Sequence, residues 1–481
     1  MKTTSFKINL RQLFLLLATV TFVLAILYRM SFKDFLISRI YFMDEEIDYN
    51  YYYEIFSYID ISLILLSFII FFIYLLYKPI IKIFSRVVTS KFLIICILTQ
   101  LLIQIVILIN IKTIPISDAT YYIEHGLRLA ETGKYINEFG NYTAFWPIGI
   151  PALIAFFKIL GLNEILLIKI INIFFSNLIL IILYLYFKSL LSDSQIKLFL
   201  LIYTLNPNNI LAAQPILTEL PFALLSWSCL LLTLHSIKYE NIKLLFFVGI
   251  IAGLCSLVKS TGLILILVII FFIAYEKSFV LKRLILFLLA AILVIGPWAY
   301  RNYTVFNEFV LTFTNGGFNF LMGNHYNSKG GTNFYFEYDI TNPNEVEEER
   351  KAYIKGINII KNDPLRFILR LPLKLFYSYY RSDHFITWSM KKTENQISPL
   401  FKSFIFVFTN GLAYVVYILS LFYFIFSVNS LIHLKEIQLI LLYFFLTIVL
   451  ILVYVGSERY IFPLFPVHLF FAIKAILINR A

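Results

Sequence analysis

The sequence has few charged residues for its length. Asp, Glu, Lys and Arg make up 14% of its 481 residues, whereas about a quarter of the positions in a soluble domain are charged. Hydrophobic residues account for 60% and aromatic residues for 18%. This composition excludes a string of conventional soluble domains and predicts one body whose solvent is lipid.

Cysteine is also scarce. Cys96, Cys229 and Cys255 all lie inside apolar runs, so we expect small buried hydrophobic residues rather than a disulfide framework or a metal cluster. The sequence contains no Walker-type phosphate loop, no HExxH zinc motif and no CxxC pair. ATP hydrolysis, zinc proteolysis and thiol redox chemistry therefore lack a supporting motif.

Positive charge is in excess but is not concentrated. The net charge is +12, yet Lys and Arg are spread over the short loops between apolar runs, so a nucleic-acid partner is not expected. Because cytoplasmic loops retain Lys and Arg, these residues place the N-terminus and the loops 78–91 and 276–283 inside. The loop 112–145 and the segment 301–400 are then external.

Apolar runs long enough to span a bilayer, which takes about 20 residues, recur along the chain. The long runs are 10–28, 58–77, 92–111, 164–187, 220–237, 284–300, 401–427, 437–455 and 461–478, and the shorter ones are 146–161, 243–258 and 260–275. The stretch 197–218 is broken at Asn206-Pro207, which favours a re-entrant hairpin with both ends outside. The predicted fold is an all-α polytopic membrane protein of about 12 transmembrane helices plus this hairpin.

The order of these runs divides the chain into four parts. Residues 1–90 form an N-terminal two-span extension, and 91–300 form a transmembrane core that contains the external loop 112–145. Residues 301–400 form an external segment, and 401–481 a C-terminal three-span part. Within the external segment we expect a charged helix over 345–362 and an amphipathic helix over 364–380 that lies on the headgroup layer.

Asp118 is the first candidate for chemistry. It follows Ser117 a few residues beyond a predicted span, at the interface, where partial desolvation can tune a carboxylate to act as a general base. The alternative is a helix N-cap, the usual role of Ser and Asp before an amphipathic stretch. Glu219 lies on the same predicted side, and its alternative is a capping acid beside Thr218.

Lys259, Arg301 and Arg459 are cations predicted to lie on the external side, where the distribution of positive charge in loops does not favour them. For any one of them, the alternative is a side chain that extends to lipid headgroups. Together with the two acids they suit displacement of a lipid phosphate, because cations stabilise the leaving group while a carboxylate takes a proton from the attacking hydroxyl. His125, His325 and His384 are expected to be structural or surface groups.

The order of several short motifs resembles the GT-C class of integral membrane glycosyltransferases, and within it the glycosyltransferase family 39-related branch of protein O-mannosyltransferases and lipid A aminoarabinose transferases. The resemblance covers about 90–480. The residues that carry it are Ser117-Asp118 with Tyr121 or Tyr122, Trp146-Pro147 through Pro151, Thr218-Glu219-Leu220-Pro221-Phe222, Leu257-Val258-Lys259-Ser260-Thr261, Pro297-Trp298-Ala299-Tyr300-Arg301-Asn302, Gly323-Asn324, and Glu458-Arg459-Tyr460 before Pro463.

This resemblance implies a polyprenyl-phosphate-linked sugar donor, inversion at the anomeric carbon, and Asp118 as the catalytic base. It also implies that Lys259, Arg301 and Arg459 contact the donor phosphate. Glu219 and Tyr122 are then substrate-binding residues, or Glu219 a second acid.

The chain departs from the pattern of this class at some points. Relatives often have Arg where this chain has Lys259, which keeps the charge but loses a bidentate fork. Residues 1–90 precede the matching part, and no function is assigned to them. The sequence requires no cofactor, and Asp118 with Glu219 gives too few ligands to support a divalent metal ion.

The expected activity is therefore transfer of a sugar to an envelope lipid, glycan or protein acceptor on the external or periplasmic side of the plasma (inner) membrane. Two alternatives remain open. A polysaccharide ligase or polymerase would use a diphosphate-linked glycan instead. A secondary transporter would also combine broken helices with intramembrane charges, although the sequence has no inverted repeat.

Overall fold

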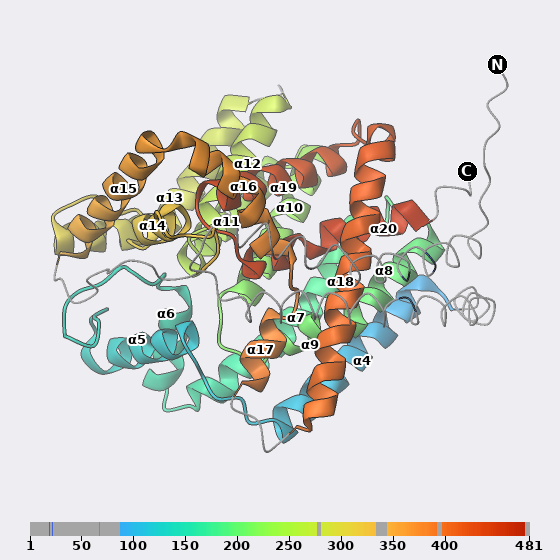
Figure 1. Cartoon of the computed structure of the whole chain (residues 1–481), viewed down its shortest axis with the longest axis horizontal. Helices are drawn as coiled ribbons and strands as arrows, with labels where there is room; N and C mark the ends of the chain where they lie inside the picture. Colours follow the sequence, from blue (N-terminus) through green and yellow to red (C-terminus); the bar gives the residue numbers. More distant parts are fainter. Residues whose placement is uncertain are drawn as a thin grey trace.

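The computed structural model describes residues 87–276, 280–332, 344–391 and 397–476, together with the single residues Thr19, Phe22 and Ser67. These parts are mostly helical (Figure 1), and their only extended pairing is an isolated bridge between Ile136 and Tyr142. The predicted spans 10–28 and 58–77 lie outside the described residues. The predicted all-α class is confirmed for the rest.

Seven helical segments within the described parts are long and apolar enough to cross a membrane. They are α4 (Thr89–Asn110), α7 (Glu164–Phe187), α10 (Glu219–Lys238), α13 (Val280–Phe306), α18 (Pro399–Ser427) continued by η2 (Val428–Ser430), α19 (Lys435–Val453), and Glu458–Ile476, which contains η3 (Glu458–Tyr460), η4 (Phe462–Leu464) and α20 (Phe465–Ile476). A helix satisfies its own backbone hydrogen bonds in lipid, and these bounds agree closely with the predicted long runs. The chain is a multi-pass membrane protein.

Three apolar helices are shorter: α6 (Gly149–Ile159), α11 (Ile242–Val258) and α12 (Gly262–Tyr275). The helices α11 and α12 are joined by a tight connection that contains Lys259. Gly262 packs so closely on the backbone of Cys255 that a Cβ would clash. The three cysteines are free and buried, as predicted.

The prediction that 146–161 spans the membrane is wrong. Near its start, α7 is tied to the first external loop, because Lys169 donates to the Thr113 hydroxyl. At its other end, the Tyr186 hydroxyl donates to the carbonyl of Glu436 at the start of α19. The chain therefore enters α7 from the side of the first loop, so α6 has not crossed. Its 11 residues rise about 16 Å, half of the hydrocarbon thickness.

The stretch 197–218 also differs from the predicted re-entrant hairpin. It contains most of α8 (Asp193–Leu205) and α9 (Pro207–Leu211). α8 begins where α7 ends, whereas α9 lies beside α17 (His384–Met390) on the opposite side, with Phe385 donating to the Asn208 side chain at 3.0 Å. Asn206 caps α9, so the Asn-Pro break starts a new helix without reversing the chain. The chain thus crosses once over α8 and α9, where no crossing was predicted, and does not cross at α6, where one was predicted. These two differences cancel, so the predicted sides of the later segments are unchanged.

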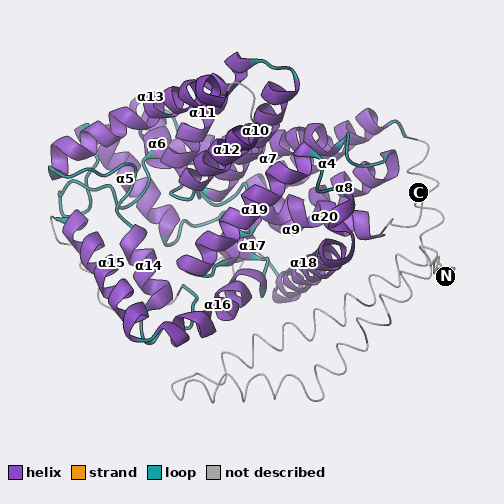
Figure 2. Cartoon of the chain, turned by 90° about the horizontal axis from the view of Figure 1, so that it is seen from above, coloured by secondary structure: helices purple, strands orange, loops and turns teal. Residues whose placement is uncertain are grey.

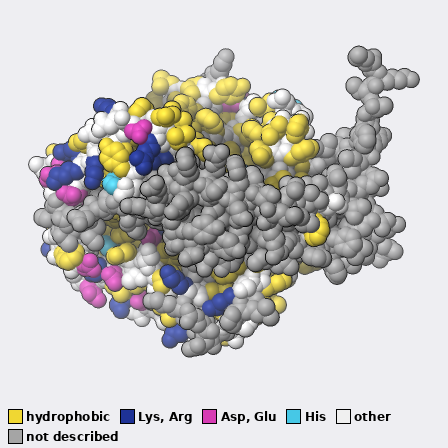
Figure 3. Space-filling view, in the orientation of Figure 1, with side chains coloured by type: hydrophobic (Ala, Val, Ile, Leu, Met, Phe, Trp, Pro, Cys, Tyr) yellow, Lys and Arg dark blue, Asp and Glu magenta, His cyan; other side chains and the backbone are white. Residues whose placement is uncertain are grey.

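The segment 301–400 carries further helices, namely the end of α13, α14 (Gly316–Asn324), α15 (Glu345–Asn362), α16 (Pro364–Tyr379), α17 and the start of α18. The bounds of α15 and α16 match the two predicted helices. α14 and α15 pack together at one edge of the molecule in both views (Figures 1 and 2). Charged side chains gather at this edge in Figure 3, and those of Arg350, Lys351 and Lys355 on α15 are exposed.

Lys374 fastens this segment to the membrane helices. Its side chain is fully buried on α16, and Nζ donates to Asn324 Oδ1 and to the carbonyl of Leu452, each at 2.9 Å. The last carbonyls of a helix have no partner within the helix, so Lys374 caps the end of α19. Burial lowers the pKa of Lys374 to about 7. The chain that leaves α19 leads directly to η3.

Replacement of Lys374 by Met should change how stability depends on pH. The folded-state pKa lies below the ordinary value of 10.5, so the unfolded chain binds the proton more tightly, and the wild-type protein should become more stable as pH rises from 7 to 10. Lys374→Met should lose this slope. It should also cost about 1–3 kcal/mol, because it leaves the capped carbonyls without a donor. Thermal unfolding in detergent at several pH values measures both, and a slope equal to that of the wild type would contradict the assignment.

The end of α19 and the start of α10 are brought together by the buried core. Trp227 of α10 is the largest fully buried side chain among the described residues, and it packs against Tyr186 and Phe187 of α7. Its indole nitrogen donates to the carbonyl of Pro463 at 3.0 Å. This contact fixes the segment after η3 against α10.

Candidate active site

A cavity of about 310 Å³ lies where these segments meet. Its walls come from the start of α5 (Asp118–Thr132), the residues before α6 and α10, the connection between α11 and α12, and parts of α14, α17 and η3. It therefore lies on the side of the first external loop. Four of the residues selected from the sequence line it: Asp118, Tyr122, Lys259 and Arg459.

Asp118 is the first residue of α5, and its side chain accepts a hydrogen bond from Arg459 Nη1. The preceding Ser117 has φ 48° and ψ −125°, an unusual backbone conformation for a residue other than glycine, and its side chain does not cap the helix. The predicted capping role is therefore not observed for either residue. Backbone strain of this kind is often found at functional sites.

Glu219 is fully buried at the start of α10. Its Oε1 accepts from Lys259 Nζ at 2.7 Å and from Arg459 Nε at 2.6 Å, while Oε2 has no partner within the described residues. A lone buried carboxylate costs several kcal/mol, so these two cations are needed to hold it. Thr218 makes no side-chain cap, and the capping alternative for Glu219 is also not observed.

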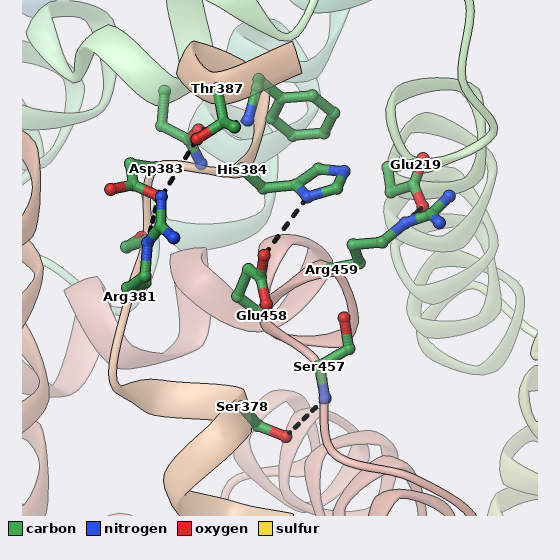
Figure 4. Close-up of polar contacts among 12 residues, drawn as sticks. Glu219, Ser378, Arg381, Asp383, His384, Thr387, Ser457, Glu458 and Arg459 are labelled. Carbon is green, nitrogen blue, oxygen red and sulfur yellow. Dashed lines mark hydrogen bonds and ion pairs between the residues drawn. The ribbon is translucent and has the colours of Figure 1, made fainter. Parts of the chain in front are cut away.

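Arg459 links the two acids, as it contacts Asp118 through Nη1 and Glu219 through Nε. Figure 4 shows its guanidinium directed toward Glu219. The group also lies over the ring of Trp388, 5.5 Å from the centroid. A planar guanidinium can make all these contacts at once because its donors form a rigid fork.

Lys259 occupies the turn between α11 and α12, where its extended backbone ends α11. Its Nζ lies 5.4 Å from the centroid of the Tyr460 ring, in addition to its contact with Glu219. The side chain is directed into the protein and is not extended toward headgroups. The alternative role for Lys259, contact with lipid headgroups, is therefore not observed.

Arg301 is not brought to the cavity. Its Nη1 donates to the carbonyl of Thr143 at 2.9 Å, its Nη2 donates to the carbonyl of Tyr135 at 2.7 Å, and its guanidinium stacks on Trp298. Because these contacts use the cation to hold the first external loop, the predicted contact between Arg301 and a donor phosphate has no geometric support. Arg301 lies on the same side as the loop 112–145, as the sequence predicted, but the sequence could not show the direction of its side chain.

Tyr122 lies one helical turn after Asp118 and is almost fully buried. Its ring meets Trp146 edge to face at 5.5 Å. Burial, reinforced by the neighbouring Asp118 carboxylate, raises the pKa of Tyr122 well above its usual value. The phenol therefore remains protonated and can serve as a hydrogen-bond donor in the cavity.

The cavity also contains residues to which the sequence assigned no catalytic or binding role. His384 and Trp388 line it, together with Glu458, which the sequence named only as part of the motif around Arg459. His384 was expected to be structural, yet its Nδ1 lies 3.4 Å from Glu458 Oε1 and its Nε2 has no partner within the described residues (Figure 4). Asp118 and His384 are separated in the sequence by more than half the length of the chain. No local sequence pattern therefore indicates that they line the same cavity.

No group of three or more His, Cys, Asp or Glu side chains is placed to hold a metal ion in the part of the chain that the structure describes. Four charged groups at the cavity, three in its lining and the buried Glu219 beside them, instead alternate in sign. Asp118, Arg459, Glu219 and Lys259 are linked by three ion pairs. Such an arrangement suits a negatively charged ligand that exchanges places with a carboxylate.

Comparison with known protein families and with curated proteins finds no match. Two solved structures of the oligosaccharyltransferase AglB from Archaeoglobus fulgidus are similar, one in complex with an inhibitory peptide and a dolichol-phosphate, the other tethered to an acceptor peptide containing the NVT sequon. Each has 13% identity and a TM-score of 0.47 over 82% of this chain. The chain spans about half the length of these structures.

Proposed function

We propose that this chain is a membrane glycosyltransferase that moves a sugar from a polyprenyl-phosphate donor to an acceptor, with inversion at the anomeric carbon. The observation that carries this proposal is that Asp118, Arg459 and Lys259 line one cavity and are linked by ion pairs through Arg459 and the buried Glu219. The set combines a carboxylate that can take a proton with cations that can stabilise a departing phosphate.

Arg459 and Lys259 form the proposed site for the donor phosphate. Both donate to the same oxygen of Glu219, so Glu219 acts as an internal anchor that holds two cations side by side. Negative charge grows on the phosphate as the sugar leaves it, and fixed cations in a largely buried site stabilise that charge more effectively than water does. The proposed phosphate site therefore omits Arg301.

Asp118 is the proposed general base. It shares Arg459 with Glu219, and a donor phosphate that accepts from Arg459 Nη1 takes the place of the Asp118 carboxylate. Asp118 is then free to accept the proton of the acceptor hydroxyl as that oxygen attacks the anomeric carbon. Donor binding thus releases Asp118 to act as the base. Sugar transfer is then favoured when donor and acceptor are both bound.

The cavity walls suit a sugar. The volume of about 310 Å³ lies at the lower end of the range for small-molecule sites, roughly 300–1,000 Å³. The rings of Tyr122, Trp146 and Trp388 form part of the lining, and the C–H faces of a pyranose pack well against aromatic rings. The acceptor is proposed to be an envelope lipid, glycan or protein on the external or periplasmic side of the plasma membrane.

The proposal is tested by offering the purified protein two donor classes with the same labelled hexose, one linked to polyprenyl monophosphate and the other to polyprenyl diphosphate. Membrane lipid and glycan extracts serve as acceptors. We expect transfer from the monophosphate donor alone. Transfer from the diphosphate donor alone would favour the ligase or polymerase alternative. Labelled sugar that accumulates unchanged inside reconstituted vesicles would favour a transporter.

A further inference from the structure

His384 begins α17 and is 5% exposed at the cavity wall. The residues around it hold this helix start in place. Arg381 Nε and Asn410 Nδ2 each donate to Asp383, at 2.9 and 2.7 Å, so both oxygens of that carboxylate are engaged away from the imidazole. These contacts are drawn in part in Figure 4.

The two nitrogens of the His384 ring have different surroundings. Nδ1 faces Glu458 Oε1 at 3.4 Å, so the carboxylate favours the tautomer with hydrogen on Nδ1 and fixes the ring orientation. Nε2 is buried and has no hydrogen-bond partner within the described residues. In Figure 4 the imidazole lies between Glu458 and the Glu219–Arg459 pair. This geometry leaves Nε2 to exchange a proton with a bound substrate.

His384 and Arg459 share one aromatic neighbour. The imidazole lies 5.1 Å from the Trp388 ring, and the Arg459 guanidinium lies 5.5 Å from the same ring. His384 therefore belongs to the wall that carries the proposed phosphate site. Asp118 approaches Arg459 from α5, on a different wall.

We propose that His384 is the general acid that protonates the lipid phosphate as it departs, and that Glu458 positions it. This inference rests on the proposed function. The acceptor oxygen forms a bond to the anomeric carbon and gives its proton to Asp118. The bond from that carbon to the phosphate oxygen breaks, the electron pair stays on the phosphate, and His384 Nε2 supplies a proton. Water then removes the proton from Asp118 and restores the one on His384.

Comparison with the other groups of the cavity wall favours His384 as the general acid. Arg459 retains its protons at every working pH. Burial raises the pKa of Tyr122 far above neutrality, so its phenol is a weak acid. An imidazole is the side chain that exchanges protons readily near pH 7. Among the described residues that line the cavity, His384 is the one histidine.

Several charged or titratable groups lie around the imidazole. Glu458 on η3 and Glu219 at the start of α10 interact with it electrostatically, Arg459 on η3 shares Trp388 with it, and Tyr417 on α18 lines a small pocket with it. Arg381 and Asp383 precede α17 and pair with each other. The residues that α9 and its N-cap place near the imidazole are asparagines, which do not titrate. Glu458 is the carboxylate in direct contact with the ring.

The test is the pH profile of single-turnover transfer by the full-length purified protein, with polyprenyl-phosphate hexose as the donor. The wild-type rate should fall at high pH as the imidazole loses its proton. His384→Gln should lower the maximal rate by about 100-fold, within the usual range for general acid catalysis, and should remove the high-pH decline. Glu458→Gln should keep the decline but move it to lower pH. His433→Gln, an exposed histidine, is the control and should behave as wild type.

Binding of farnesyl phosphate, measured by fluorescence titration, shows whether each variant is folded. A His384→Gln protein that binds this probe and yet turns over at the wild-type rate, or that keeps the high-pH decline, would overturn the inference. A variant that no longer binds the probe would overturn it too, because His384 would then be a binding or structural residue. If the wild-type protein transfers no hexose from either donor class, the proposed function itself fails.

Discussion

Asp118→Asn is expected to abolish sugar transfer while donor binding is retained. The amide oxygen of Asn can still accept from Arg459 Nη1, the contact that Asp118 makes, but it cannot take a proton from the acceptor. General base catalysis contributes about 10²–10⁴-fold to rates, so we expect kcat to fall by a factor within about this range. The affinity for farnesyl phosphate should stay the same or rise, because the phosphate no longer competes with a carboxylate for Arg459.

The matched control is Glu131→Gln, which makes the same chemical change at an exposed position on the same helix. This variant should keep the wild-type rate. An Asp118→Asn protein that is folded and binds farnesyl phosphate, but retains more than a tenth of the wild-type rate, would show that Asp118 is not the base.

Arg459→Gln is expected to have the second large effect. The substitution removes the cation that joins Asp118 to Glu219 and leaves Glu219 with Lys259 as its ion-pair partner. A charge-assisted hydrogen bond is worth about 1.5–3 kcal/mol, and two such bonds are at stake. We therefore expect kcat/KM to fall by about 100-fold or more, at about 1.4 kcal/mol for each factor of ten. Arg459→Lys should recover part of this loss, because it restores the charge without the fork.

Arg301→Gln provides the comparison. Arg301 holds carbonyls of the first external loop, so its replacement should lower thermal stability and expose this loop to proteases. The affinity for farnesyl phosphate should change little in the Arg301 variant and should fall in the Arg459 variant. The reverse result would return Arg301 to the phosphate site and contradict the geometry described above.

The membrane helices were predictable because hydrophobicity and length determine them. A run such as 164–187 must form a helix in lipid, and it coincides with α7. The path of the chain between helices was less predictable. An 11-residue apolar helix that packs on α5 has the same composition as part of a span, and the break at Asn206 could either reverse the chain or start a new helix. Tertiary contacts at Lys169 and Tyr186 decide between these paths.

The charged residues of the site were found for a related reason. Asp118, Glu219, Lys259 and Arg459 interrupt or border apolar runs, where an ionised group is costly, so each stands out in the sequence. Arg301 stands out equally and serves the loop instead, because rotamer and direction are set by packing. His384 does not stand out, since it lies in a polar stretch where a histidine carries no penalty. Its relation to Glu458 appears only when η3 and α17 meet.

The stoichiometry of the reaction tests the central claim most directly. The purified protein is mixed with polyprenyl-phosphate hexose labelled in both the sugar and the phosphate, and the products are separated and counted. The account predicts one polyprenyl phosphate released for each sugar transferred, with an inverted anomeric linkage in the product and no free inorganic phosphate. Sugar that crosses a membrane without release of polyprenyl phosphate, or a product with retained configuration, would contradict it.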